Sequence, residues 1–205
     1  MRAVLTASGR REYRELDTRS QVLAEGLIAP LRPGQRQRLA EALTTADRLL
    51  SAAAVTVVQV DPLDEEAIAS LKRYFDELDE RFDTGFDAGD SITADADGYR
   101  PPNGAFILGR HGDEAVACGA VHRFAHDVAE IKRMWVSSDW RRVGLGRRVL
   151  EHLEHEGRSL GCTMVRLDTN SVLTEAIAIY RSAGYLPIER YNDNPFARCW
   201  FEKQL

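Results

Sequence analysis

The residues best suited to chemistry in this 205-residue chain lie in a basic stretch that runs from Met134 to Arg147. It has the pattern of a strand, then a turn rich in arginine, then the start of a helix, with Gly144 and Gly146 in the turn. Glycine lets the backbone approach an anion closely, and the first turn of a helix presents unpaired N–H groups whose dipole favours negative charge. The stretch therefore predicts a phosphate-binding turn. It is not a Walker A loop, because no Lys-Ser or Lys-Thr pair follows it.

Two blocks of the sequence resemble the GNAT N-acetyltransferase family. Arg141-Arg142-Val143-Gly144-Leu145-Gly146 fits the family's Arg/Gln-x-x-Gly-x-Gly/Ala loop, and residues 176–185 fit its Ala-x-x-x-Tyr segment followed by Gly-Phe/Tyr. The resemblance covers residues 54–205. It implies the GNAT acyl-CoA N-acyltransferase fold, an α/β (α+β) architecture in which a mixed, mainly antiparallel sheet is splayed at its centre and flanked by helices.

The resemblance also implies acetyl-CoA as cosubstrate and roles for individual residues. Tyr180 would protonate the leaving thiolate, although a core tyrosine is the other interpretation. Backbone groups of Met134 and Val136 would pair with the pantetheine arm as with an added strand. The CoA pyrophosphate would bind to the amides of the turn, namely Arg141, Arg142, Val143, Gly144, Leu145, Gly146 and Arg147.

The chain departs from the family pattern at three positions. Arg142 stands where the family often has Gly, and Ser138 stands where it often has Pro; neither change is expected to disturb the backbone of the turn. Leu173 stands where many members carry Asn, so Asn170 would supply a side-chain hydrogen bond to CoA instead, or would only form a turn.

Glu130 is the candidate general base. An acceptor amine with a pKa of about 10.4 must lose a proton before it attacks a thioester. Strand alternation over residues 128–136 predicts that one face of the strand carries Glu130, Lys132, Met134 and Val136. The Glu130 side chain would then point into the cleft that holds the pantetheine arm. The alternative is an ion pair of Glu130 with Lys132 or Arg133.

The acceptor site is expected where the next strand ends. Asp168 and Thr169 would contact the acceptor there, although Asp168 could equally cap the following turn. The turn 191–196 and a long loop are expected to border the same site, and a cationic acceptor could be attracted by the loop carboxylates Asp87, Asp90, Asp95 and Asp97; solvated aspartates are the other interpretation.

Residues 54–205 read as one domain with alternating strands and helices. Strands are expected at 55–60, 105–110, 115–124, 128–136, 164–168, 185–189 and 199–203, and helices at 64–82, 144–160 and 173–183. The loop 83–104 is too long to lack structure inside a compact domain, so we expect it to be partly helical or functional.

Residues 1–53 read as a two-helix arm, with helices expected at 6–29 and up to about residue 50. Leu5-Thr6-Ala7-Ser8-Gly9-Arg10 and Leu31-x-x-x-Gln35-Arg36-x-x-Leu39 resemble the C-terminal dimerisation helices of a MarR-type transcriptional regulator. This implies a homodimer through the arm. It also raises an alternative function, a fragment of a MarR-type regulator whose acetyltransferase-like domain senses a ligand. No groove-reading element is visible, so specific DNA binding by this chain is not expected.

Composition and charge limit the classes of acceptor, bound metal and cellular location that are expected. Residues 1–50 carry nine Lys and Arg against six Asp and Glu, and the remainder 18 against 26, so the larger part is acidic and suits a cationic acceptor better than nucleic acid. The three cysteines have no CxxC spacing, and the pair His152 and His155 has no third ligand, so neither a disulfide nor a metal is expected. No apolar signal peptide or membrane-length run is present, which predicts a cytoplasmic protein. Taken together, the expected function is transfer of an acetyl group from acetyl-CoA directly to the primary amine of a small molecule or protein.

Overall fold

The computed structural model describes residues 4–83, 85–87, 93 and 95–205. The chain forms two compact units, Met1–Asp47 and Arg48–Leu205. The larger unit holds the sheet and all of the residues discussed below as a site, whereas the described part of the smaller one consists of helices and short non-helical segments. Each unit is treated by itself.

The N-terminal helices follow the predicted pattern closely. α1 spans Ala7–Ile28 and is capped by the Thr6 hydroxyl, which accepts a hydrogen bond from the Gly9 amide at 3.1 Å. α2 spans Pro33–Ala54 and begins at a proline, which is tolerated in the first turn because the missing N–H would have had no partner there. Throughout α1, all of which is described, no residue is buried.

Seven strands form one sheet in the order β1-β2-β3-β4-β5-β7-β6. Only β4 and β5 run parallel; the other neighbouring pairs are antiparallel, as expected. The strands are β1 (Thr56–Val60), β2 (Gly104–His111), β3 (Glu114–Arg123), β4 (Val128–Val136), β5 (Met164–Thr169), β6 (Leu186–Ile188) and β7 (Cys199–Gln204).

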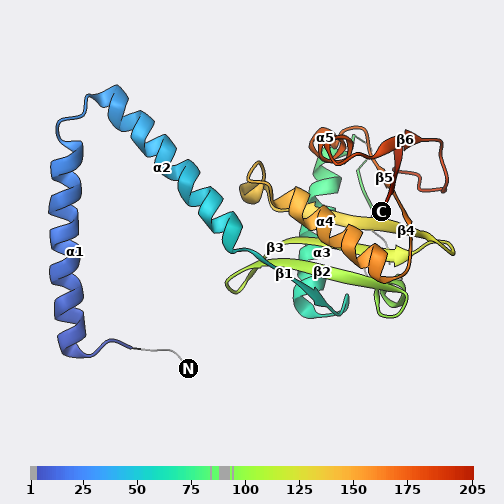
Figure 1. Cartoon of the computed structure of the whole chain (residues 1–205), viewed down its shortest axis with the longest axis horizontal. Coiled ribbons are helices and arrows are strands. Elements are labelled where there is room, and N and C mark those ends of the chain that lie inside the picture. The colour runs from blue at the N-terminus through green and yellow to red at the C-terminus, as the bar shows by residue number, and fades with distance from the viewer. Residues whose placement is uncertain (1–3, 84, 88–92, 94) are drawn as a thin grey trace. The chain divides into compact units, whose positions relative to one another are not determined.

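Helices cover both faces of this sheet (Figure 1). α4 (Leu145–Ser159) buries Val149, Leu150 and Leu153 against one face, and α3 (Glu65–Arg81) buries Leu71 and Phe75 against the other. α5 is Thr174–Ser182, and two short 3-10 turns are η2 (Ala96–Tyr99) and η3 (Ser138–Trp140). Since η2 lies within the long loop 83–104, that loop is partly helical as predicted.

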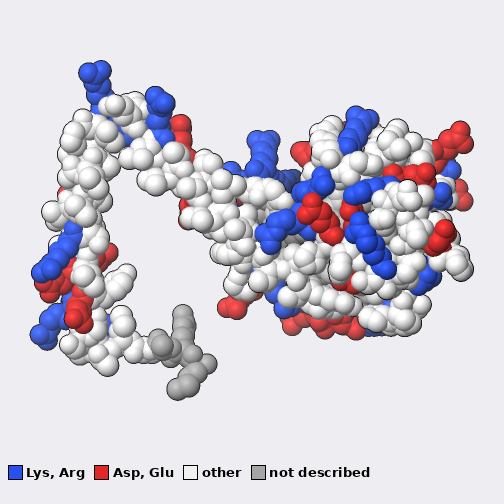
Figure 2. All heavy atoms as spheres, in the orientation of Figure 1, with Lys and Arg blue, Asp and Glu red and all other residues white. Residues whose placement is uncertain are grey.

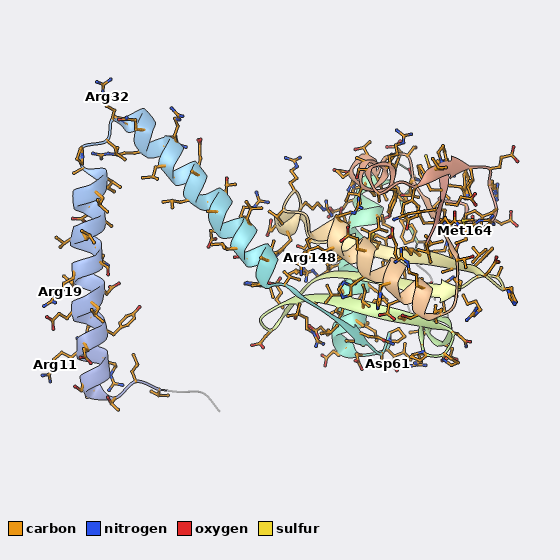
Figure 3. All side chains as sticks on the ribbon, viewed as in Figure 1. Arg11, Arg19, Arg32, Asp61, Arg148 and Met164 are labelled. Atoms are coloured by element: carbon orange, nitrogen blue, oxygen red, sulfur yellow. The ribbon has the colours of Figure 1, made fainter. Side chains whose placement is uncertain are left out.

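The end of α2 belongs to the larger unit through one arginine of α4. Arg148, labelled in Figure 3, donates to the carbonyl oxygens of Ala52 and Val55 at 2.6 and 2.8 Å. Because these bonds satisfy carbonyls at a helix end, they fix the point where α2 turns into β1.

The sheet is splayed at its centre. β4 and β5 pair only from Val128 with Met164 to Ile131 with Leu167, although β4 continues to Val136 and β5 to Thr169. The last residues of β4 therefore have no strand partner on the β5 side. This opening is the one that the resemblance implied.

A β-bulge in β4 changes which face its side chains occupy. Cys118 of β3 pairs with Trp135 and Ala120 pairs with Lys132, so two residues of β4, Arg133 and Met134, oppose a single residue of β3. Arg133 adopts the left-handed conformation with φ 57°. The extra residue reverses the alternation of the strand beyond it.

The predicted common face of Glu130, Lys132, Met134 and Val136 is therefore wrong. Before the bulge, Ile131 packs with the α4 side; after it, Trp135 packs with the α3 side and Val136 with the α4 side. Glu130 consequently lies on the face opposite to Val136.

Candidate active site

The turn between β4 and α4 has the backbone of an anion site. Gly144 is the N-cap of α4 in a left-handed conformation, with φ 83°. No amide of residues 142–147, all of which are described, donates to another protein group, and the first such bond of the helix is from Arg148 to Gly144 at 3.2 Å. These N–H groups sit at the positive end of the helix dipole, which makes them suitable for a phosphate.

Arg142 occupies a backbone position that favours glycine. Its φ is 64° and its side chain is exposed. The departure from the family's glycine was expected to be harmless to the turn, and the turn does form, but a residue with a Cβ is strained in this region. The exposed guanidinium is left available to an anion.

The two flanking arginines are held by the protein. Arg141 donates to the Val136 carbonyl at 2.9 Å and to the Glu77 carboxylate at 2.6 Å. Arg147 donates to Glu151 at 2.7 Å and to the Ser182 carbonyl at 3.2 Å. Both side chains therefore brace the turn from outside, whereas the backbone amides remain free.

The open edge of β4 lies beside this turn. The Ser137 amide donates to Val116 of β3 at 2.9 Å, so the ladder alternation turns the peptide groups of Val136 away from β3, toward the splay. Gly146 lets α4 lie close to α5, because a Cβ there would come within 2.9 Å of the Ile179 side chain, whereas its distances of 3.9 Å to the Met134 and Val136 side chains would be ordinary contacts.

A cavity of about 340 Å³ opens at the splay. Its walls come from β4, β5, α3, α5, the loop before β2 and the turn before β7. Among the described residues, its lining is Tyr74, Phe75, Leu78, Phe82, Phe86, Asp87, Asp95, Tyr99, Ile131, Lys132, Arg133, Met134, Asp168, Thr169, Asn170, Leu173, Ala176, Tyr180, Asn194, Pro195, Phe196 and Ala197.

Tyr180 presents its hydroxyl to this cavity. The ring is buried against Tyr185 and Phe201, but among the described residues the hydroxyl donates only to the Met134 sulfur, at 4.0 Å. A thioether is a weak acceptor, so the proton can be given to a better one. Burial, with a contribution from the Asp168 charge, raises the pKa of Tyr180 above its usual value.

Asp168 and Thr169 reach the cavity at the end of β5, as predicted. Asp168 accepts from Lys132 at 2.6 Å and from Asn194 at 3.0 Å, and it also accepts from Asn192. The Asn170 side chain is bonded within the protein: its amide donates to the Phe196 carbonyl at 2.7 Å, and its oxygen accepts from the Val172 amide at 3.1 Å. Asn170 therefore forms the turn after β5, and its hydrogen bond to CoA stays a prediction.

Glu130 lies behind Asp168 and is not part of the cavity wall. Its carboxylate accepts from His122 at 2.9 Å, Tyr191 at 2.8 Å and Asn192 at 3.1 Å, and it pairs with Lys132 at 3.1 Å. Burial raises its pKa, but the hydrogen bond from His122, the Lys132 charge and the bond from Tyr191 outweigh burial and lower the pKa to about 2. Of the two interpretations left open for Glu130, the ion pair with Lys132 is present.

The predicted border of the site is partly as expected. Asn194 and Phe196 of the turn 191–196 line the cavity, whereas the Tyr191 hydroxyl donates a hydrogen bond to Glu130. Of the loop carboxylates, Asp87 and Asp95 line the cavity, and Asp97 pairs with Arg100 at 2.5 Å. Asp90 lies outside the described residues.

Two features of the cavity were not predicted from the sequence. Arg133 enters its wall only because the bulge turns the strand, and strand alternation carries no signal of a bulge. The second feature is a group of phenylalanines whose spacing was interpreted only as a core face or a turn; they contact one another at ring distances of 4.6–6.1 Å and are Phe75, Phe82, Phe86 and Phe196.

Over the described residues, no group of three or more His, Cys, Asp or Glu is placed to hold a metal ion. In the same part of the chain, no helix has the length and apolar character needed to cross a membrane.

Comparisons with known proteins agree with this geometry. The model of the acetyltransferase (GNAT) family matches residues 64–185. The IAA acetyltransferase of Azospirillum brasilense is 30% identical over 158 residues, which cover 74% of this chain and 98% of that protein. The ribosomal protein bS18-alanine N-acetyltransferase of Salmonella typhimurium is 34% identical over 73 residues, 36% of this chain and 49% of the relative.

Solved structures show the same fold. A GNAT-family acetyltransferase from Staphylococcus aureus superposes with a TM-score of 0.63 at 14% identity, covering 74% of this chain and 99% of that one. The matched family model ends before residue 186 and does not include residues 1–63, so the MarR resemblance of the arm stays a prediction. With a splayed sheet and a family model that matches more than half of its length, this chain belongs to the GNAT acetyltransferase family and is an acyl-CoA-dependent N-acetyltransferase.

Proposed function

We propose that the enzyme transfers acetyl from acetyl-CoA directly to the primary amine of a small acceptor bound in the cavity at the splay. One observation carries the proposal: the open edge of β4, the Tyr180 hydroxyl and the Asp168 carboxylate all meet in this cavity. Together they supply a place for the thioester arm, a proton donor and an anionic group for an amine.

The turn and the β4 edge would hold acetyl-CoA. The free amides of Arg142, Val143, Gly144, Leu145, Gly146 and Arg147 would receive the pyrophosphate, with the Arg142 guanidinium beside them. Arg141 would act indirectly by holding the Val136 carbonyl and the turn. Since that carbonyl already has a donor, the pantetheine arm would pair with the Val136 amide and the peptide groups of Met134.

In the chemical step, the amine lone pair attacks the thioester carbonyl carbon and the C–S bond breaks. The departing sulfur takes the proton of the Tyr180 hydroxyl, and the new amide nitrogen releases its extra proton through water to the Tyr180 phenolate, which restores the hydroxyl. A raised pKa keeps Tyr180 protonated at neutral pH, which a general acid needs. Acetyl-CoA supplies the activated acyl group, and Tyr180 supplies the proton that makes the thiol leave.

Asp168 is the carboxylate that an acceptor ammonium would meet first. Lys132 and the asparagines of the 191–196 turn hold it in place, and the pair with Lys132 fixes its orientation. Glu130 was the predicted base, but a buried group with a pKa of about 2 and four partners binds a proton poorly. We therefore assign Glu130 a positioning role behind Lys132 and Asp168.

Direct transfer is supported by the state of the cysteine nearest the bulge. Burial raises the pKa of Cys118 to about 12, so its thiol is not ionised at neutral pH. It donates instead to the Arg133 carbonyl at 3.5 Å. A covalent acyl-enzyme on this sulfur would need a thiolate that the site does not provide.

The size and walls of the cavity favour a small apolar acceptor. Small-molecule sites measure roughly 300–1,000 Å³, and the volume here lies near the lower end of that range. A protein amine, as acted on by the bS18-alanine N-acetyltransferase, remains the alternative acceptor.

We also propose that the arm, residues 1–53, joins two copies of the chain. Tyr13, Leu16, Leu23 and Leu27 recur at helical spacing along α1, and each is more than 60% exposed. Figure 2 shows that residues other than Lys, Arg, Asp and Glu occupy much of the visible surface of α1 and α2. A helix with an unpaired apolar stripe needs a partner, and a second copy would offer the same stripe.

The first experiment is calorimetric titration with acetyl-CoA, followed by thiol release against a panel of small amines and peptides. Binding with turnover of small amines supports the proposal. Binding without any turnover would instead support the ligand-sensing regulator. In the same assay, Arg142→Asp should weaken acetyl-CoA binding at least about tenfold, whereas Arg158→Asp, at the far end of α4, should not. Equal loss in both variants would contradict the assignment of the turn.

A further inference from the structure

One guanidinium stands among the aromatic walls of the acceptor cavity. Arg133 lines the cavity, and its side chain is only 8% exposed. Its carbon Cζ lies 5.7 Å from the Phe75 ring centroid and 5.2 Å from that of Tyr99. Arginine keeps its charge under all ordinary conditions, so a full positive charge is held in a largely apolar place.

The partners of this charge are incomplete. Nε donates to the Tyr99 hydroxyl at 3.3 Å, and one terminal nitrogen, Nη2, donates to Asp95 at 2.9 Å. The other terminal nitrogen, Nη1, is buried and has no hydrogen-bond acceptor among the described residues. A buried donor without an acceptor costs free energy, which an incoming oxygen would recover.

Asp95 is a replaceable partner. Its side chain is 62% exposed and comes from the loop just before η2, whereas Arg133 is fixed in the bulge of β4. A guanidinium presents its two terminal nitrogens as a fork that matches a carboxylate, so a ligand carboxylate could engage Nη1 and Nη2 together. Asp95 would then move out to solvent at little cost.

The cavity offers matching places for the rest of such a ligand. Asp168, paired with Lys132, is the carboxylate on the β5 side, and the phenylalanines of α3 and of the turn before β7 form an apolar wall. A molecule with an ammonium, a carboxylate and an apolar side chain satisfies all three. A simple amine would leave the Arg133 donor unsatisfied.

Building on the proposed function, we infer that the acceptor is a free amino acid with an apolar or aromatic side chain, whose carboxylate binds Arg133 in place of Asp95. Acetylation of its amine removes the positive charge and leaves a carboxylate product. Asp95 thus occupies the carboxylate position until the acceptor arrives.

The test compares three acceptors that differ only in the carboxylate: L-phenylalanine, L-phenylalaninamide and 2-phenylethylamine. Thiol release with each gives kcat and KM. The wild type should prefer phenylalanine to both others in kcat/KM by at least about tenfold, because a site built to bond a polar group rejects analogues that lack it. Equal rates with the amide would point to a peptide N-terminus and overturn the inference.

Variants identify the residue responsible. Arg133→Gln should raise KM for phenylalanine at least about tenfold and leave KM for phenylethylamine within about twofold. Asp95→Asn should lower KM for phenylalanine alone, since it removes a competing carboxylate. Arg110→Gln is the matched control, because Arg110 is also a strand arginine in an ion pair, with Glu66, but lies outside the cavity wall.

The outcomes distinguish a failure of the amino-acid inference from a failure of the proposed function. If phenylethylamine is turned over as well as phenylalanine, or if Arg133→Gln affects both equally, the amino-acid inference fails while the acetyltransferase stands. If acetyl-CoA does not bind and no amine is turned over, the proposed function fails first. Should Arg133→Gln not fold, judged by circular dichroism, the wild-type comparison and Asp95→Asn still decide the question.

Discussion

The hydroxyl of the buried Tyr180 donates to a thioether, the Met134 sulfur, which is a weak acceptor. Tyr180→Phe removes the hydroxyl but keeps the ring packed against Tyr185 and Phe201. We expect kcat to fall by about 10²-fold, the lower end of general acid catalysis, with acetyl-CoA affinity unchanged. Steady-state kinetics and calorimetry measure the two quantities.

The matched control for this prediction is Tyr185→Phe. Tyr185 is buried 5.8 Å from Tyr180, ring to ring, but lies outside the described lining of the cavity. Its loss of a hydroxyl should leave kcat within about twofold. A similar fall in both variants would indicate packing, not proton donation.

The lowered pKa of Glu130 predicts how the stability of the protein depends on pH. Its pKa is lowered from 4.5 to about 2, so its contribution to stability is complete above pH 4.5 and is lost as the pH falls toward 2. A shift of this size corresponds to at most about 3 kcal/mol. Urea unfolding should therefore show a stability gap between wild type and Glu130→Gln that narrows from pH 7 to pH 3.

The same variant separates positioning from base catalysis. If Glu130 were the direct base, Glu130→Gln would abolish the rise of kcat/KM with pH between 6 and 9. A positioning residue instead lowers kcat/KM across the whole range and leaves the shape of the profile intact. We expect the second result, because a group that titrates near 2 cannot produce a rise near neutral pH.

The sequence could predict some of these residues and not others, for physical reasons. Asp168 occurs near the end of a predicted strand, and Tyr180 occurs inside a family motif. In both cases the position along the chain indicates the position in the fold. The orientation of Glu130 depended on unbroken alternation, and Arg133 on a left-handed backbone that no side-chain pattern reveals. Phe75 and Phe82 fit a core stripe, and only the splay of the sheet makes part of that core a cavity wall.

At the scale of elements, the turn from β4 to α4 contains a backbone strain that can be measured. Arg142 has φ 64°, and relief of such strain is worth roughly 1 kcal/mol. Arg142→Gly should stabilise the larger unit by about that amount relative to Arg142→Ala, which loses the same charge but keeps the strain. Chemical unfolding of the two variants gives the difference directly.

Ligand binding provides the second arm of this comparison. Both variants lose the guanidinium, so both should bind acetyl-CoA more weakly than the wild type and by similar factors. If the alanine variant alone binds weakly, the backbone of the turn and not the charge determines affinity.

Element boundaries were predicted well because their signals are local. Gly184 follows α5 in a left-handed conformation, and β-branched residues mark β1, so each predicted end lies within a few residues of the observed one. The bulge was not foreseen, because it is a change of backbone conformation at Arg133 that no side-chain pattern reveals. Gly119, opposite the bulge, is where a Cβ would come within 2.7 Å of Leu153.

At the scale of the whole molecule, the arm predicts concentration-dependent association. Leu23→Asp places a charge in the apolar stripe of α1, where its side chain is now 66% exposed. If two copies meet there, size-exclusion chromatography with light scattering should show a mass of two 23.0 kDa chains for the wild type and of one for the variant.

Thr18→Asp is the control on the opposite side of α1. Its hydroxyl donates to the Arg14 carbonyl of the same helix, at 2.9 Å, so an added charge there should not affect association. Turnover per chain should be alike in all three proteins, because the described cavity is built entirely from the larger unit. A wild type that is monomeric at all concentrations would refute the role given to the arm.

The extra residue in β4 has a meaning for the gene as well as for the fold. Before the bulge, Ile131 packs on the α4 side of the sheet. Beyond it, the alternation is shifted by one residue, so that Val136 rather than Trp135 faces α4. If β4 formed an unbroken ladder with no residue lost, Trp135 would face α4 and Val136 would face α3. Loss of the Arg133 codon would instead remove the bulge and leave both side chains on their present faces. A single in-frame deletion at this point would therefore take the Arg133 side chain out of the cavity wall without exchanging the faces of the strand beyond it.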